Sequence, residues 1–198
     1  MDHQQLIALF TFAFVMIVTP GPNNIMLMTS GANVGFMKTL PHMLGVTVGF
    51  SAMVMLIGLG LVGIFDAFPV LHTVLQVISG GYLLYLAYAI ATSSAHTERG
   101  DDQYRPLTFW MAVSFQWVNP KGWSMALSTV TLYNPSGNWQ GIAIIAAVYA
   151  MVNLPSTGMW TLAGQKLQRV LTHPTRLRVF NYAMAALLVA STVPAMLL

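Results

Sequence analysis

Two short stretches hold most of the residues that could bind a ligand, and each lies in the middle of an apolar run. The first is Thr19-Pro20-Gly21-Pro22-Asn23-Asn24, within residues 6 to 28. Because proline has no N–H, the carbonyl groups of Met16 and Val18 lose their helical partners. Thr is a good N-cap, Pro is favoured at the first helical position, and Gly21 eases a bend. We therefore expect the helix to break and restart here, with Thr19 as the N-cap.

The second stretch, Val118-Asn119-Pro120-Lys121-Gly122, lies in another apolar run, at residues 108 to 133. Asn119 is again a good N-cap residue, and Pro120 again fits the first helical position. Each proline could simply kink a buried helix, since proline is common in transmembrane helices. Two breaks at corresponding places favour a functional discontinuity, because broken helices at membrane depth form binding sites in transporters.

Composition places the chain in a membrane. Of the 198 residues, 56% are hydrophobic and 7% are charged, whereas a soluble domain has about 25% charged residues. The net charge of +3 comes from too few residues to indicate nucleic-acid binding. Cysteine is absent, which excludes disulfides, thiol redox chemistry and cysteine-bound metals. We expect no metal, no cofactor and no catalytic residue.

Six apolar stretches are long enough to span a bilayer as helices. They lie at about residues 6 to 30, 41 to 64, 69 to 92, 108 to 132, 139 to 163 and 178 to 197. Seven of the eight basic residues lie outside these spans: Lys38, Arg99, Arg105, Lys166, Arg169, Arg176 and Arg178. All seven fall on one side of the predicted membrane, which the positive-inside rule assigns to the cytoplasm. Both termini are therefore predicted to lie outside.

The predicted fold is an all-α integral membrane protein, a single domain over residues 1 to 198. Residues 1 to 92 and 108 to 198 form two inverted three-helix repeats with broken first and fourth helices, joined by a cytoplasmic linker at 93 to 107. The alternative makes residues 118 to 123 the tip of a re-entrant hairpin. That topology would leave four basic residues outside, so we prefer six spans.

Lys121 is the basic residue nearest the centre of a predicted span, which makes it a functional-site hypothesis. With the positive ends of the restarted helices, it would suit a carboxylate. The carbonyls of Met16, Val18 and Gln116, with nearby asparagine side chains, could receive an ammonium group. Lys121 could instead snorkel, and the asparagines could serve only interhelical hydrogen bonds. The candidate substrate-binding residues are Thr19, Pro20, Gly21, Pro22, Asn23, Asn24, Gln116, Asn119, Pro120 and Lys121.

The charges in the spans favour one kind of substrate. No Asp or Glu lies inside a span, and a strongly cationic substrate would need a carboxylate partner. A neutral amino acid is therefore preferred to lysine or arginine. Proton coupling would need Lys121 or a histidine; His42 and His72 lie near span ends, where histidine is more often interfacial than a proton relay.

Two further features stay open at this level. Gly45 and Gly49 allow close helix contact, which serves either the bundle or a homodimer interface. Asn153-Leu154-Pro155-Ser156 interrupts the fifth span, which either widens a cavity or kinks a helix.

The chain resembles the LysE/RhtB family of bacterial amino-acid exporters over essentially its whole length. The stretch from Thr19 to Asn23 matches that family's first-span signature, and Asn119-Pro120-Lys121 matches its fourth-span signature. Gly81-Tyr82-Leu83 and Leu86-Ala87 resemble its third-span pattern, in which Gly is frequent at the position of Ala87. Residues 160 to 164 and 168 to 169 resemble the cysteine and O-acetylserine exporter branch.

The resemblance implies export of amino acids or their metabolites across the inner membrane, driven by the proton motive force. The leading hypothesis is a secondary transporter that exports a neutral amino acid or derivative by alternating access. The alternative within transport is an efflux permease for an ion or another small toxic compound. A membrane enzyme or electron carrier is disfavoured, because the chain has no cysteine and no GxSxG or Ser/His/Asp set.

Overall fold

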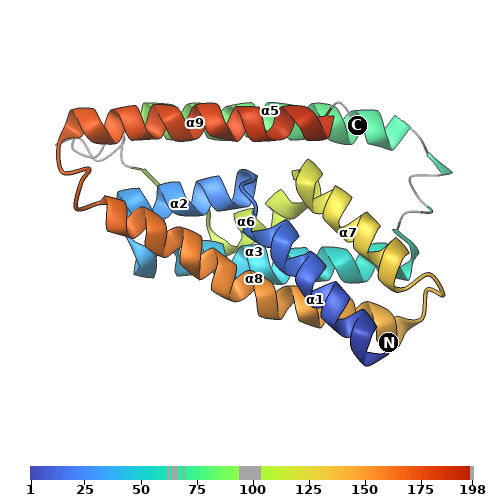
Figure 1. Cartoon of the computed structure of the whole chain (residues 1–198). Helices are drawn as coiled ribbons and strands as arrows, with labels where there is room; N and C mark the ends of the chain where they lie inside the picture. Colours follow the sequence, from blue (N-terminus) through green and yellow to red (C-terminus); the bar gives the residue numbers. More distant parts are fainter. Residues whose placement is uncertain (62, 64–66, 69, 94–103, 197–198) are drawn as a thin grey trace.

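The computed structural model describes residues 1–61, 63, 67, 68, 70–93 and 104–196, and the regular elements in this part of the chain are all helices (Figure 1). This confirms the predicted all-α class. The elements are α1 (His3–Val18), α2 (Pro22–Val34), α3 (Phe36–Leu56), the π-helix η1 (Ile57–Leu61), α5 (Val70–Thr92), α6 (Phe109–Phe115), the 3-10 helix η2 (Gln116–Val118), α7 (Pro120–Tyr133), α8 (Trp139–Leu167) and α9 (Pro174–Met196).

Helix length and hydropathy support part of the predicted set of spans. Three helices, at Phe36–Leu61, Thr73–Thr92 and Trp139–Leu167, are long and apolar enough to cross a membrane. The helices α1 and α2 are long and apolar enough only when taken together, as a pair bent by 55° at the break between them. The second, third and fifth predicted spans therefore have helical counterparts of sufficient length, and the first has one as a bent pair.

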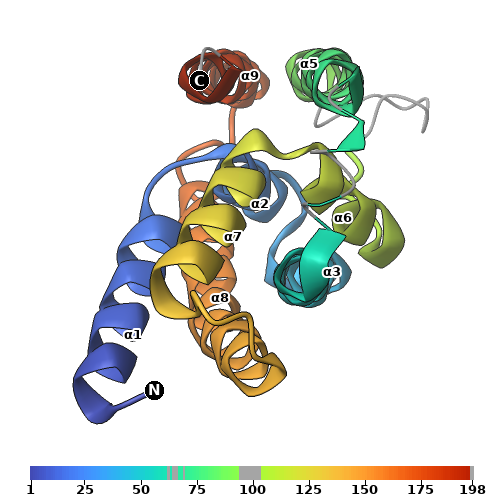
Figure 2. The ribbon, with the colours of Figure 1, turned by 90° about the vertical axis from the view of Figure 1, so that its right-hand side faces the viewer.

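The helices run lengthwise in alternating directions. In Figure 1, α1 followed by α2 runs from right to left, whereas α6 followed by α7 runs from left to right. The helices α5 and α9 lie side by side in a layer of their own (Figure 2). One apolar cluster joins α1, α3, α7 and α8, and a second joins α2, α3, α5, α6 and α9. Both clusters include residues of α3, which therefore links them.

Glycines bring two helix pairs into close backbone contact. A Cβ on Gly31 would meet the carbonyl of Thr161 in α8, and one on Gly164 would meet the carbonyl of Met28 in α2. Similarly, a Cβ on Gly49 would lie 2.7 Å from the Cα of Val113 in α6. Small residues permit such contacts between helices in membranes. In the second predicted span, Gly49 thus serves a contact within the bundle.

Two details of the predicted helices are wrong. Pro155 does not interrupt the fifth span, because it lies inside α8, a continuous helix of 29 residues. A single proline removes one backbone donor, and an apolar surrounding favours keeping the remaining helical bonds. The second helix begins at Phe36 and not near residue 41, because Gly35, with a φ of 83°, separates it from α2 and Pro41 is accommodated within the helix.

Candidate functional site

The first predicted break is present, but its helix restarts later than expected. Thr19, with φ −61° and ψ 141°, and Gly21, with φ −171° and ψ 177°, are extended. Each precedes a proline, whose ring disfavours the helical conformation in the residue before it. The expectation that Thr19 caps the restarted helix was therefore wrong. Gly21 occupies the N-cap position of α2, and Pro22 is its first residue.

Side chains of the first break bind three carbonyl groups at the end of α1, including that of Met16, which Pro20 leaves without a helical donor. The Asn24 amide donates to the carbonyl oxygens of Ile17 at 2.7 Å and Thr19 at 2.9 Å. The Thr19 hydroxyl donates to the Met16 carbonyl at 2.8 Å. The carbonyl of Met16, expected to be available to an ammonium group, is thus already paired.

The second predicted break is confirmed at the predicted residue. After α6 and η2, Asn119 is extended, with φ −91° and ψ 105°, and α7 begins at Pro120. The Asn119 N–H donates to the Gln116 carbonyl at 3.3 Å, so this second expected acceptor is also paired. The Asn119 side chain is 3% exposed and makes no capping hydrogen bond, and within the described part of the chain its Oδ1 has no partner. Such a buried, unpaired oxygen needs an explanation.

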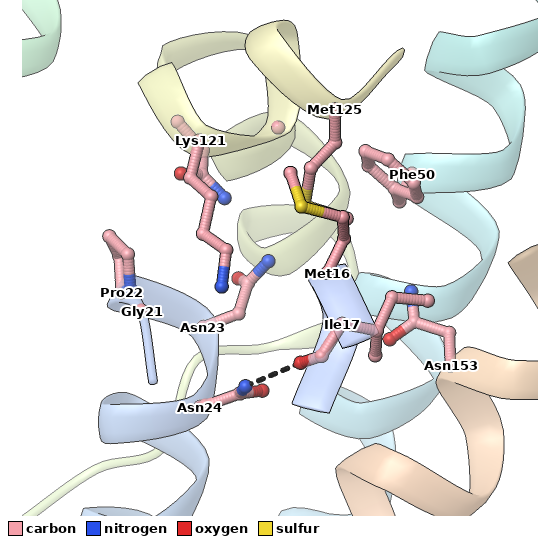
Figure 3. Close-up of a pocket in the computed structure, with 12 residues that line it drawn as sticks. Met16, Ile17, Gly21, Pro22, Asn23, Asn24, Phe50, Lys121, Met125 and Asn153 are labelled. Carbon is pink, nitrogen blue, oxygen red and sulfur yellow. Dashed lines mark hydrogen bonds between the residues drawn. The ribbon is translucent and has the colours of Figure 1, made fainter. Parts of the chain in front are cut away.

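Lys121 connects the second break to the first. Its Nζ donates to the Thr19 carbonyl at 2.7 Å, to the Thr19 hydroxyl at 2.9 Å and to the Pro20 carbonyl at 3.4 Å. The side chain passes directly over Gly21, where a Cβ would lie 2.7 Å from its Cδ and 3.0 Å from its Nζ. The lysine charge therefore lies at the carboxyl end of α1 and beside the amino end of α2, close to both half-helix ends (Figure 3).

A pair of amides forms a second connection between the breaks. The Asn23 Nδ2 donates to the Gln116 Oε1 at 2.8 Å, and the Gln116 Nε2 donates back to the Asn23 Oδ1 at 3.3 Å. Gln116 also donates to the Ala112 carbonyl at 2.9 Å and is fully buried. The two predicted stretches, about a hundred residues apart in sequence, are therefore brought into direct contact.

A small pocket that opens to the outside lies between the two breaks, with a cavity volume of about 30 Å³ (Figure 3). Six of the predicted residues line it: Gly21, Pro22, Asn23, Asn24, Asn119 and Lys121. Thr19, Pro20, Gln116 and Pro120 do not line it, but they belong to the breaks that shape it. Sequence reasoning missed the apolar side of the pocket, formed by Met16, Ile17, Phe50 and Met125, because an apolar residue in an apolar run carries no signal of its own.

Backbone N–H groups at the starts of two helices lie at this pocket. In α2 the first helical hydrogen bond runs from the N–H of Ile25 to the Gly21 carbonyl, at 3.0 Å. The N–H groups of Asn23 and Asn24 come before it and therefore have no acceptor within the helix. In α7 the N–H groups of Lys121 and Gly122 have the same position. Neither helix has a side-chain hydrogen bond at its N-cap. Helix N-termini of this kind attract anions.

Acidic residues are not among those that line the pocket. In the described part of the chain, no three His, Cys, Asp or Glu side chains gather to hold a metal ion. His42 is fully buried in α3, with its Nδ1 3.5 Å from the Ser30 hydroxyl. It is not among the residues that line the pocket, and the side chain of His72 lies outside the described part.

Comparison with known proteins gives consistent results. A family model described as LysE type translocator matches residues 14–197. The Cysteine/O-acetylserine efflux protein of Salmonella typhimurium is 31% identical over 196 residues, which are 96% of each chain. The protein of the same name from Escherichia coli K12 is 31% identical over 191 residues, 93% of each chain. No solved structure matches this chain.

Proposed function

This chain belongs to the LysE-type translocator family, and from that premise we propose that it exports a neutral amino acid or a derivative of one from the bacterial cytoplasm. The relatives are named for efflux of cysteine and O-acetylserine. Both compounds are small amino acids with a carboxylate, an ammonium group and an uncharged side chain. The pocket offers groups that suit each of these parts.

The observation that carries the proposal is the meeting of two uncapped helix N-termini in one pocket. The substrate carboxylate binds the free N–H groups of α2 and α7, where the backbone dipoles favour negative charge. Lys121, whose ammonium lies beside Gly21, adds a positive charge to this region. The substrate ammonium pairs with the Oδ1 of Asn119, which otherwise has no partner in the described part of the chain. A cationic side chain would find no carboxylate in the pocket lining.

The proposed architecture is six spans in two inverted repeats, residues 1 to 92 and 108 to 198. The opposite directions of α1–α2 and α6–α7 in Figure 1 support it. The chain keeps the same direction along the bundle from α6 to α7, whereas a re-entrant hairpin would turn back. This favours a bent span. The same figure draws the start of α1 and the end of α9 at one end of the bundle, as expected if both termini face outside.

We infer a transport cycle of alternating access in which the proton motive force drives export. The close backbone contacts of α2 with α8 include Gly164, beside Lys166 in the last turn of α8, a residue on the side that the positive-inside rule assigns to the cytoplasm. These contacts would close the cytoplasmic side in this conformation. Substrate would enter the pocket from the cytoplasm only after α2 and α8 separate there.

The test is uptake into everted membrane vesicles, in which export appears as accumulation. The panel of labelled substrates contains threonine, homoserine, cysteine, O-acetylserine, leucine and lysine, with and without an imposed pH gradient, and vesicles without the protein are the control. We expect faster uptake of at least one neutral member, increased by the gradient. If none accumulates faster despite verified expression, the amino-acid proposal is wrong, and ions or toxic compounds should be tested. If uptake occurs at the same rate with and without the pH gradient, only the proposed proton coupling is wrong.

A further inference from the structure

We propose that Asn153 selects substrates whose side chain ends in a hydrogen-bonding group, and that it sets the specificity of the pocket. This inference rests on the proposed function, because it concerns the same pocket. Asn153 belongs to α8, a helix that carries none of the residues of either break. In Figure 3 it lies across the pocket from Lys121.

The amide of Asn153 is buried but unused. Its side chain is 6% exposed and lines the pocket, and within the described part of the chain it makes no hydrogen bond. Asn23 and Asn24, which line the same pocket, are instead paired with Gln116 and with backbone carbonyls. Neither polar atom of Asn153 is among the fully buried unpaired atoms of the described residues, so the amide stays accessible within the pocket. A ligand that replaces solvent there and pairs with the amide is favoured over one that covers it without a hydrogen bond.

The position of Asn153 assigns it to the substrate side chain. The carboxylate and ammonium of the substrate are held at the starts of α2 and α7, on the side of the pocket that includes Lys121. Phe50, Met125 and Met16 provide an apolar wall with no other polar side chain among them. A short side chain that reaches Asn153 can offer a thiol, a hydroxyl or an ester oxygen, each of which an amide can bind. A methyl group at the same position would leave the amide unpaired.

The experiment compares competitors that differ in one terminal group. Cysteine, serine and 2-aminobutyrate have side chains of equal length that end in sulfur, oxygen or methyl. Each competes, unlabelled, against whichever panel substrate the protein takes up, in everted vesicles containing the native protein, Asn153→Leu or Asn153→Ala. Leucine has the same number and branching of side-chain heavy atoms as asparagine but has no polar atom. Thr157→Val is the matched control, because Thr157 is buried in the same helix, donates to the Leu154 carbonyl at 2.9 Å and does not line the pocket.

We expect the native protein to prefer serine or cysteine to 2-aminobutyrate by about tenfold, the value of one net hydrogen bond. Asn153→Leu should reduce this ratio to about one, and Thr157→Val should leave it unchanged. Equal ratios in the native and Asn153→Leu proteins overturn the inference, as does a native protein without the preference. If both Asn153 variants lose all uptake of the labelled substrate, Asn153 is structural and the inference fails. Absence of all uptake by the native protein would instead refute the proposed function.

Discussion

Replacing Lys121 by methionine tests the link between the two breaks. Methionine keeps most of the side-chain length and apolar volume but removes the ammonium group. The structure gives that group two short hydrogen bonds to Thr19, at 2.7 and 2.9 Å, and a longer one to the Pro20 carbonyl, at 3.4 Å. The Thr19 carbonyl keeps its bond from Asn24 in the variant. The Pro20 carbonyl loses its bond from the lysine.

The expected loss follows from the number of bonds. A hydrogen bond to a charged group contributes about 1.5–3 kcal/mol net. Because Lys121 is only partly buried and the Thr19 carbonyl keeps a partner, we assign about 2–3 kcal/mol to the whole interaction. At 1.4 kcal/mol for each factor of ten, transport by Lys121→Met should fall about 30- to 150-fold. Membrane insertion should be unaffected, because removing a charge from a span favours insertion.

The assay is the initial rate of substrate uptake into everted vesicles, divided by the amount of protein in the membrane. Lys166→Met is the matched control, because Lys166 is an exposed lysine in the last turn of α8, far from the pocket lining. Gly21→Ala supplies a second perturbation, since its Cβ would displace the Lys121 side chain. The double variant should lose little more activity than either single variant, because both changes remove one interaction.

Two results would refute this reasoning. One is uptake by Lys121→Met within about threefold of the native rate, since that corresponds to less than 1 kcal/mol. The other is an additive loss in the double variant, which would mean that Gly21 and Lys121 act independently.

Three other predictions concern the breaks and helix contacts. Gly31→Ala should lower the free energy of unfolding in detergent by about 1–3 kcal/mol, because its Cβ would meet the α8 backbone. Gly81→Ala is the control, because a Cβ there would meet open space. Equal effects of the two substitutions would contradict the prediction. Tyr104→Phe removes a 2.8 Å hydrogen bond to Ser30 and should cost about 1 kcal/mol. Burial raises the pKa of Tyr104 to about 12, so thermal melts should show the same cost at pH 6 and 8. Pro20→Ala frees the preceding residue to continue α1 and should reduce vesicle uptake more than membrane abundance on immunoblots; equal reductions would favour a purely structural proline.

The two breaks could be predicted because proline acts locally. The missing N–H and the fixed φ of Pro22 and Pro120 affect only a few neighbouring residues, whatever surrounds them. The same local chemistry also explains the one error at the first break, since the pre-proline restriction on Gly21 delays the start of α2. Pro155 shows the limit of local reasoning. It has the same covalent structure as the other prolines, but no second proline or extended residue accompanies it, and α8 continues.

The partners of the polar side chains depend on tertiary structure and could not be predicted. From its position near the centre of a span, Lys121 was predicted to bind the substrate carboxylate. Its actual partners, Thr19 and Pro20, come from the other half of the chain. Asn153 shows the reverse case, since its place near a proline left open whether the stretch widens a cavity or kinks a helix. Its importance comes from its position in the pocket lining and its lack of a partner, which depend on how α8 packs against the breaks.

Gly21 shows how a correct motif can carry an incomplete explanation. Glycine in a proline-rich stretch suggests a bend, but the φ of Gly21 is −171°, an extended conformation that any residue adopts. The bend therefore does not require glycine. A Cβ at residue 21 would instead displace the outer part of the Lys121 side chain, which occupies that space. The glycine of the first break and the lysine of the second thus form one structural unit, and selection for the lysine contact is sufficient to keep the glycine.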